Sequence, residues 1–258
     1  MSARSAELAG NLAGIRARIT AACAAAGRDE SEITLIAVTK TYPASDVLAL
    51  AGLGQGDFGE NRDQEAARKA AEVSAAIEAS VPGSATAKAS VTWHFIGQLQ
   101  TNKARSVAGY ADFVHSVDRI RLVRALGAAA SAAGRNLICL VQVSLDPADA
   151  DADAALAGAP AGQARGGAPP ALLGEIAAAI EAEPGLTLGG LMAVAPLGAD
   201  PWTAFASLRR LSAAIRSVNP SATAISAGMS GDLEAAIASG ATHLRIGTAL
   251  LGIRRQVR

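Results

Sequence analysis

The sequence predicts a single α/β domain folded as a (β/α)8 TIM barrel. Three observations support this prediction: eight short β-rich runs, helical patterns between them, and a length of 258 residues, which one barrel commonly reaches. Half of the residues are hydrophobic but only 3% are aromatic. Much of the apolar content is therefore alanine, which favours helices.

An amphipathic helix is expected between Ser5 and Ala26, before the first strand. Gly27 follows this segment as a stop signal. The apolar residues that recur at helical spacing are Leu8, Leu12, Ile15 and Ile19.

The eight expected strands are Thr34–Val38, Asp57–Gly59, Thr92–Ile96, Phe113–Val117, Leu137–Val143, Leu188–Val194, Thr223–Ser226 and His243–Ile246. Helical patterns are clearest at Arg62–Ala79, Arg119–Ala133, Ala171–Ala182, Thr203–Val218 and Leu233–Ser239. Strand and helix thus alternate, which favours a parallel barrel over the alternative of a doubly wound open sheet. In a barrel the functional groups are expected at the C-terminal ends of the strands.

Two stretches, residues 80–90 and 147–170, interrupt this alternation. Neither has a periodic apolar face, so both are interpreted as insertion loops within one domain that spans residues 1–258. The second contains alternating aspartates but lacks the glycine turn and final glutamate of a calcium-binding loop.

The charge balance favours a small-molecule partner. With 23 basic and 23 acidic residues, the chain has no overall field that would attract nucleic acid or an anionic membrane. Cys23 and Cys139 have the apolar surroundings of small buried hydrophobes, and no set of residues has the spacing of a zinc site. The N-terminal segment is charged and no segment reaches membrane-spanning length, so the protein is expected to be cytoplasmic. It is also expected to be a monomer.

Lys40 is the first candidate for chemistry. It follows the run ITLIAVT, so it lies just past the end of the first expected strand. A lysine at the mouth of a barrel is expected to be partly desolvated, which favours the neutral, nucleophilic amine over the ammonium. From this segment alone, an ordinary surface lysine remains the alternative interpretation.

Two glycine-containing turns near the C-terminus are suited to binding a phosphate. Ser226–Gly231 joins a strand to a helix with small residues, and its backbone N–H groups and two hydroxyls are able to receive an anion. Arg245–Thr248 (RIGT) supplies a second turn after the last strand, and barrel loops after the last two strands often hold phosphate. The alternative is that these glycines only close turns.

Six segments together resemble the pyridoxal-phosphate homeostasis proteins, also called the YggS/PROSC family. They are ITLIAVTKTYPASDV, FGENRDQEAARKA, WHFIGQLQTNKARSV, VHSVDR, GLMAVAPLGAD and SAGMSGDLEAAIASGATHLRIGTALLG. The match covers nearly the whole chain outside the two interrupting stretches. The resemblance implies a barrel similar to the N-terminal domain of alanine racemase, with pyridoxal 5′-phosphate (PLP) as cofactor.

The resemblance also implies roles for individual residues. Lys40 becomes the lysine that forms a Schiff base with PLP, and Arg245 faces the pyridine nitrogen, where a cation discourages ring protonation and weakens the cofactor as an electron sink. Ser226, Ser230, Gly247 and Thr248 surround the phosphate. Asn61 and Met192 line the ring or the lysine, although ordinary core packing is an equal alternative for Met192. The full cofactor-binding set is Lys40, Asn61, Met192, Ser226, Met229, Ser230, Arg245, Gly247 and Thr248.

Three residues remain without a firm role at this stage. His94 and His115 are expected either to approach the cofactor or to belong to a buried polar network, and the network is the favoured interpretation. Ala227 stands where the family has methionine, because SAGMS replaces SMGMS. That change removes packing next to the pocket but no phosphate donor.

The function implied by the resemblance is PLP homeostasis: the protein holds the cofactor reversibly, without a committed catalytic reaction, and transfers it to apo forms of PLP-dependent enzymes. A PLP-dependent amino-acid racemase is the main alternative, since the same fold and cofactor support proton exchange when a base stands on each face. Neither tyrosine, Tyr42 nor Tyr110, has the sequence context of the second racemase base. A Schiff-base aldolase without cofactor would leave Arg245 and the two phosphate-type turns less well explained.

Overall fold

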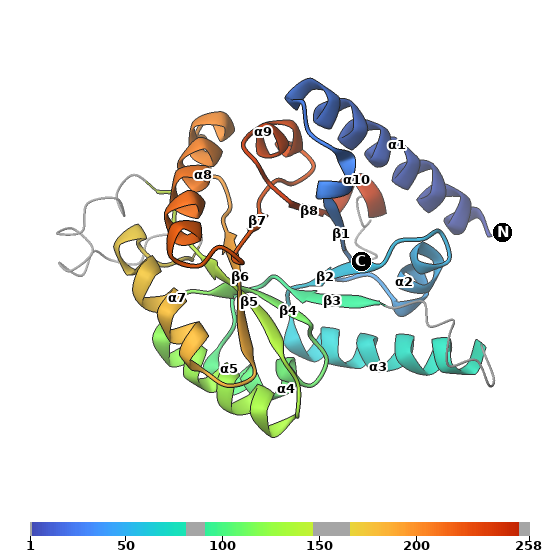
Figure 1. The fold of residues 1–258 in the computed structure, drawn as a ribbon. Coiled ribbons are helices and arrows are strands. Elements are labelled where there is room, and N and C mark those ends of the chain that lie inside the picture. Colours follow the sequence, from blue (N-terminus) through green and yellow to red (C-terminus); the bar gives the residue numbers. More distant parts are fainter. Residues whose placement is uncertain (1, 81–90, 147–165, 253–258) are drawn as a thin grey trace.

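Eight parallel strands close into a barrel in which each strand pairs with the next along the chain and β1 pairs with β8 (Figure 1). The computed structural model describes residues 2–80, 91–146 and 166–252. The strands are β1 Thr34–Val38, β2 Asp57–Glu60, β3 Thr92–Phe95, β4 Phe113–Val117, β5 Leu137–Gln142, β6 Leu186–Met192, β7 Ala224–Ser226 and β8 His243–Ile246. Pairing of the first with the last strand excludes the open, doubly wound sheet.

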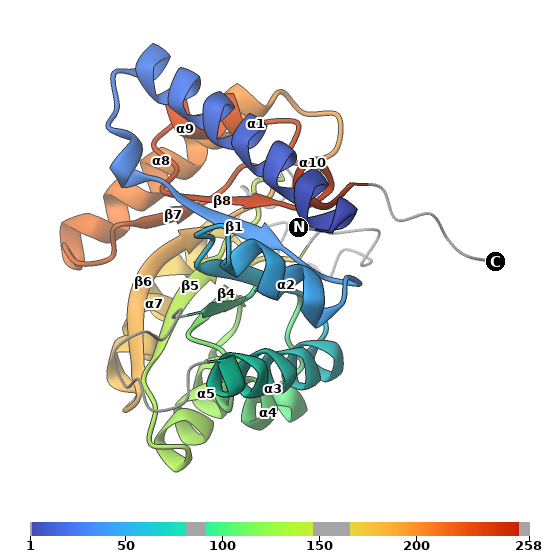
Figure 2. The same ribbon diagram turned by 90° about the vertical axis from the view of Figure 1, so that its right-hand side faces the viewer.

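Helices surround the strands on the outside of the barrel (Figures 1 and 2). The α-helices are α1 Ala3–Ala26, α2 Ala44–Ala51, α3 Asp63–Ser80, α4 Ala104–Ala108, α5 Ile120–Ala132, α7 Leu173–Ala182, α8 Pro201–Val218, α9 Leu233–Ala238 and α10 Thr248–Leu251. Short 3-10 turns are η1 Glu30–Glu32, η2 Thr101–Lys103 and η4 Pro170–Leu172.

The sequence predicts all eight strands, with their ends placed within two residues of those observed. The short helices α2, α4 and α10 are not predicted, because four to eight residues offer few turns in which a helical period can be recognised, whereas the equally short α9 is predicted. The predicted N-terminal helix is confirmed as α1. Its apolar stripe is buried against α9 and α10, and Gly27 ends it in the left-handed conformation at φ 65°.

The insertion loops expected at 80–90 and 147–170 lie largely outside the described residues. Within the second, residues 166–170 are described, and they pack on the barrel. Ala168 is buried and forms a parallel bridge with Val143, while Ser144 N–H donates to the carbonyl of Ala168. This short extension beside β5 gives no periodic signal in the sequence, because a single buried alanine makes the contact.

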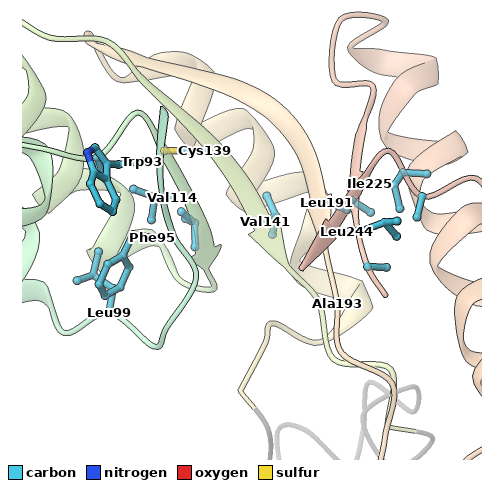
Figure 3. Close-up of a cluster of buried hydrophobic side chains, with 14 of the residues drawn as sticks. Trp93, Phe95, Leu99, Val114, Cys139, Val141, Leu191, Ala193, Ile225 and Leu244 are labelled. Atoms are coloured by element: carbon cyan, nitrogen blue, oxygen red, sulfur yellow. The ribbon is translucent and has the colours of Figure 1, made fainter. Parts of the chain in front are cut away.

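The larger apolar core lies between the strands and the helices. Figure 3 shows part of it, with side chains contributed by β3 through β8. The barrel interior has a separate and much smaller apolar cluster of Leu140, Met192 and Ala224. Because side chains alternate along a strand, the residues between these outward-facing positions point inward, and many of the inward-facing ones are polar.

The outer core generates a first prediction. Phe58 is fully buried, and its ring centroid lies 5.9 Å from that of Trp93. We expect Phe58→Ala to lower the free energy of unfolding by about 3–5 kcal/mol, because it leaves a cavity between strand and helices. Val218→Ala is the matched control, since Val218 is 84% exposed and its truncation is expected to cost less than about 0.5 kcal/mol. Urea unfolding measures both, and equal losses would contradict this description of the core.

Candidate functional site

The turn that contains Lys40 lies at the C-terminal end of β1. β1 ends at Val38, and Lys40 itself is exposed. The partial desolvation expected for this lysine is therefore not observed, because the residue lies beyond the strand end and outside the packed interior. Thr41 adopts φ 68°, which is strained for a β-branched residue, so the turn has to be held by its surroundings.

A buried ionic cluster supports this turn. Lys69, on α3, donates to Glu60 Oε1 at 2.6 Å, to Glu65 Oε1 at 3.1 Å and to the carbonyl of Thr39 at 2.8 Å. Glu65 also accepts the backbone N–H of Thr41. Burial raises the pKa of Glu60, although Lys69 and the Thr39 hydroxyl donate to its carboxylate. The cluster thus fixes residues on both sides of Lys40.

Barrel closure brings the C-terminal turns to the same end. In the pairing of β1 with β8, Ile36 lies opposite Arg245, and a Cβ atom at Gly247 would lie 3.5 Å from the carbonyl oxygen of Val38. The turn after β7 is joined to the turn after β8 by a hydrogen bond of 3.3 Å from Ala249 N–H to Ser230 Oγ. The two phosphate-type turns predicted from the sequence therefore meet next to the strand that leads to Lys40.

Arg245 is a buried cation in the barrel interior. Its guanidinium donates to two neutral oxygens, Ser226 Oγ at 2.6 Å and the carbonyl oxygen of Ala193 at 2.9 Å. Burial lowers the pKa of Arg245 to about 10, while the charge of Asp232 acts in the opposite direction. Arg245 therefore stays charged at neutral pH and is suited to a polar group of a ligand.

Ser226 is fully buried and lies next to Arg245. Its oxygen also bonds to His115 Nδ1 at 2.9 Å, so its hydroxyl is engaged within the barrel. Ser230, by contrast, is only partly buried and is joined to the turn after β8. The two serines that the sequence groups around one phosphate therefore have different surroundings.

Asn61 follows β2, and among the described residues its buried side-chain oxygen has no hydrogen-bond partner. The same holds for Glu60 Oε2. A Cβ atom at Gly97 would lie 2.2 Å from the carbonyl oxygen of Asn61, so only glycine permits this close approach after β3. Buried polar oxygens without partners are costly unless a ligand or water satisfies them.

The two methionines of the predicted set lie in different environments. Met192 is buried at the end of β6 with Leu140 and Ala224, and it pairs with Ser226 across the strands. Met229 is 38% exposed, and its backbone N–H donates to Asp232 Oδ1 at 2.5 Å. Met192 therefore belongs to the interior beneath the site, and Met229 to the turn at its edge.

Both uncertain histidines belong to a buried hydrogen-bonded network. His94 Nδ1 lies 2.9 Å from His115 Nε2, and His94 Nε2 lies 2.9 Å from Asp57 Oδ1. Burial, with the charge of Arg245 acting in the same direction, lowers the pKa of His115 well below its usual value. The sequence analysis missed Asp57, Lys69 and Gly97. Only Gly97 had a local signal, as the glycine of WHFIG, because the others acquire their partners through tertiary contacts.

None of the helices in the described ranges combines the length and apolar character that crossing a bilayer requires. In the same part of the chain, no group of three or more His, Cys, Asp and Glu side chains is arranged to hold a metal ion.

Comparison with known proteins identifies the family. Residues 11–255 match the model for the alanine racemase N-terminal domain. The chain is 42% identical to a pyridoxal phosphate homeostasis protein of Mycobacterium tuberculosis (strain ATCC 25618 / H37Rv), over 98% of this chain and 95% of the relative. It is 37% identical to that of Escherichia coli (strain K12), over 96% and 97%. This chain belongs to the pyridoxal phosphate homeostasis protein family.

A solved structure agrees with this membership. PipY of Synechococcus elongatus PCC7942, solved with PLP bound, superposes with a TM-score of 0.74 at 32% identity, covering 95% of this chain and all of PipY. The predicted fold, an alanine racemase N-terminal-domain-like (β/α)8 barrel with an extra N-terminal helix, is therefore confirmed.

The close approach at Gly97 generates the second prediction. We expect Gly97→Ala to destabilise the protein by about 1–3 kcal/mol, because the new methyl group would overlap the Asn61 backbone. Gly174→Ala is the control: Gly174 lies in α7 with no atom within 4 Å of the position that a Cβ atom would occupy, so alanine there is expected to be neutral or to stabilise by up to about 1 kcal/mol. Equilibrium unfolding in urea distinguishes them, and a neutral Gly97→Ala would contradict the observed approach.

Proposed function

We propose that this protein binds PLP as a Schiff base on Lys40 and takes part in intracellular PLP homeostasis, without a committed catalytic reaction. The observation that carries the proposal is the closure of β1 on β8, which brings the strand end that leads to Lys40 next to Gly247 and to the joined turns of Ser230 and Gly247. Membership of the pyridoxal phosphate homeostasis protein family and the likeness to PLP-bound PipY support it.

Lys40 supplies the amine that condenses with the cofactor aldehyde. Its exposure leaves the amine accessible, while the cluster of Lys69, Glu60 and Glu65 holds the turn in place. A supported turn reduces the conformational entropy that a bound cofactor has to remove. When bound, PLP contributes the aldehyde and the electron-withdrawing ring.

The phosphate is assigned to the two joined turns. Ser230 offers a hydroxyl, and Gly247 and Thr248 offer backbone groups after β8, with Met229 at the edge of the turn after β7. Backbone N–H groups and hydroxyls at strand ends of this kind bind anions. Each hydrogen bond to a charged phosphate contributes on the order of 1.5–3 kcal/mol.

Arg245 is assigned to the pyridine nitrogen. A cation at that nitrogen disfavours its protonation, and an unprotonated ring stabilises a carbanion less well. Ser226 serves the cofactor through Arg245 in this proposal, since its hydroxyl is engaged by Arg245 and His115. Asn61 and Met192 line the ring. The side-chain oxygen of Asn61, which has no partner among the described residues, is available to accept a hydrogen bond from the cofactor.

The racemase alternative is not supported by the positions of the tyrosines. Tyr42 donates its hydroxyl to the carbonyl oxygen of Gly252 at 2.7 Å. Tyr110 lies in the turn before β4, at the N-terminal end of the barrel, and burial raises its pKa further above the usual value. Neither is placed as a second base opposite Lys40.

A holder of this kind requires recipients for its cofactor. We propose apo forms of PLP-dependent enzymes as those recipients, and a monomer in the cytoplasm as the working form. The balance of 23 basic and 23 acidic residues favours such recipients over nucleic acid or a membrane, because it produces no overall electric field that would attract either.

We expect the purified protein to be yellow and to keep a pyridoxyl group on Lys40 after borohydride reduction and mass mapping. Lys40→Ala is expected to lose the adduct and keep its fold, because the residue is exposed and outside the core. Lys103→Ala is the matched control. It removes another partly exposed lysine, whose ion pair with Asp63 is weak because Lys103 Nζ and Asp63 Oδ2 lie 3.8 Å apart, and it is expected to retain the adduct. Recovery of the reduced group on a different lysine would refute the assignment.

We also expect no significant racemase activity on free amino acids when PLP is fully bound. Loss of one positioned acid or base typically costs roughly 10²–10⁴-fold, and Arg245 at an unprotonated ring adds to this. The measurement is deuterium exchange at the α-carbon of L-alanine, followed by NMR, with free PLP and Lys40→Ala as controls. Lys40-dependent exchange at enzyme-like rates, with D-alanine formed, would establish a racemase instead.

A further inference from the structure

A continuous run of hydrogen bonds crosses the barrel interior from Arg245 to Asp57. The links are Arg245 Nη1 to Ser226 Oγ at 2.6 Å, Ser226 Oγ to His115 Nδ1 at 2.9 Å, His115 Nε2 to His94 Nδ1 at 2.9 Å, and His94 Nε2 to Asp57 Oδ1 at 2.9 Å. One residue comes from each of β8, β7, β4, β3 and β2. We call this run the interior relay.

The two ends of the relay set its direction. Arginine has only donors and an ionised carboxylate only acceptors, so Arg245 donates at one end and Asp57 accepts at the other. His115 is neutral, because burial, with the charge of Arg245 acting in the same direction, lowers its pKa well below the usual value, and it therefore carries one ring hydrogen. If that hydrogen is on Nε2, every link has one donor and one acceptor: Arg245 to Ser226, Ser226 to His115, His115 to His94, and His94 to Asp57.

The opposite placement is electrostatically worse. A hydrogen on His115 Nδ1 would require both nitrogens of His94 to be protonated, since His94 Nε2 already donates to Asp57. That would put a second cation in a buried interior that contains Arg245, with the His94 ring stacked on Phe113 at 4.5 Å. Asp57 would pair with that cation, but the like charge of Arg245 and the loss of hydration on burial oppose it, so the one-directional arrangement is favoured.

A third histidine lies near the relay and does not compete with it. His243, on β8, has its ring centroid 6.2 Å from that of His94 and 6.3 Å from that of His115. Its Nδ1 bonds to the Thr242 hydroxyl at 2.8 Å, and burial lowers the pKa of His243 to about 4. It is therefore neutral at pH 7.

We propose that Asp57, His94 and His115 are positioning residues: they keep the Ser226 hydroxyl donating to His115 and so hold Arg245 in one orientation. With its hydrogen given to His115, Ser226 presents only lone pairs to Arg245. Hydrogen bonds in series polarise one another, so the carboxylate of Asp57 strengthens the hydrogen bond that Ser226 Oγ accepts from the Arg245 guanidinium. The orientation of Arg245 toward a pyridine nitrogen rests on the proposed function, whereas the direction of the relay does not.

The direct test needs no cofactor. The complete chain, free of PLP and labelled with ¹⁵N, is studied by long-range ¹H–¹⁵N correlation NMR at pH 7.5, and His243→Gln helps to assign the three imidazoles. We expect both His94 and His115 to carry hydrogen on Nε2 and none on Nδ1. A wild-type His115 with hydrogen on Nδ1, or a doubly protonated His94, would overturn the proposal even if every variant failed to fold.

Variants then test the role of the carboxylate. Asp57→Ala is expected to release the direction, so that His94 and His115 both show mixed tautomers, and Asp57→Glu is expected to restore the wild-type pattern. Asp112→Asn is the matched control, because Asp112 lies just before β4 and binds Arg135 at 2.7 Å outside the relay. Unchanged tautomers in Asp57→Ala, in a protein with wild-type circular dichroism, would refute the proposal.

PLP itself provides the second readout. We expect the Kd for PLP to rise about tenfold in Asp57→Ala and to stay within about twofold in Asp112→Asn. Altered tautomers without any loss of affinity would refute the link to Arg245. If the wild-type protein failed to bind PLP, the proposed function would fall, while the tautomer pattern would still decide the direction of the relay.

Discussion

The pairing of β1 with β8 is the interaction on which the rest of the structure depends. It joins segments that are about two hundred residues apart in the chain, and it places Ile36 opposite Arg245 and Gly247 against Val38. Pairing of distant strands costs loop-closure entropy before its contacts form, and the helices offset that cost by burying the outer face of the sheet. Without this closure, the Lys40 turn and the phosphate-type turns would have no common location.

Closure creates an interior that is unusually polar for a barrel, where branched apolar side chains are the rule. Such an interior is stable only if its members satisfy one another, because an unpaired buried polar group costs about as much as several favourable contacts contribute. The relay from Arg245 through Ser226 and the two histidines to Asp57 meets that requirement. In our proposal, the same hydrogen bonds that stabilise the barrel also orient Arg245, the cation assigned to the ring site.

The Lys40 turn is held in a different way. Thr41 stores backbone strain, and Glu65 and the buried Lys69 hold that strained conformation through charge-assisted hydrogen bonds. Lys40 itself stays exposed. In the proposed function, a supported turn with an accessible amine, together with Arg245 assigned to the ring nitrogen, favours reversible retention of the cofactor over catalysis on a substrate.

The sequence by itself determined the order and number of the strands, the opening helix and the family, because these depend on local periodicity and on motifs that are continuous in the chain. It could not determine the environment of each residue. Ser226 and Ser230 look equivalent in the motif, yet one is buried on Arg245 and the other joins the turn after β8. Asp57, Lys69 and the two histidines gained their roles only from tertiary structure, since their partners lie on other strands and helices, and hydrogen-bond geometry between distant segments leaves no local pattern to read.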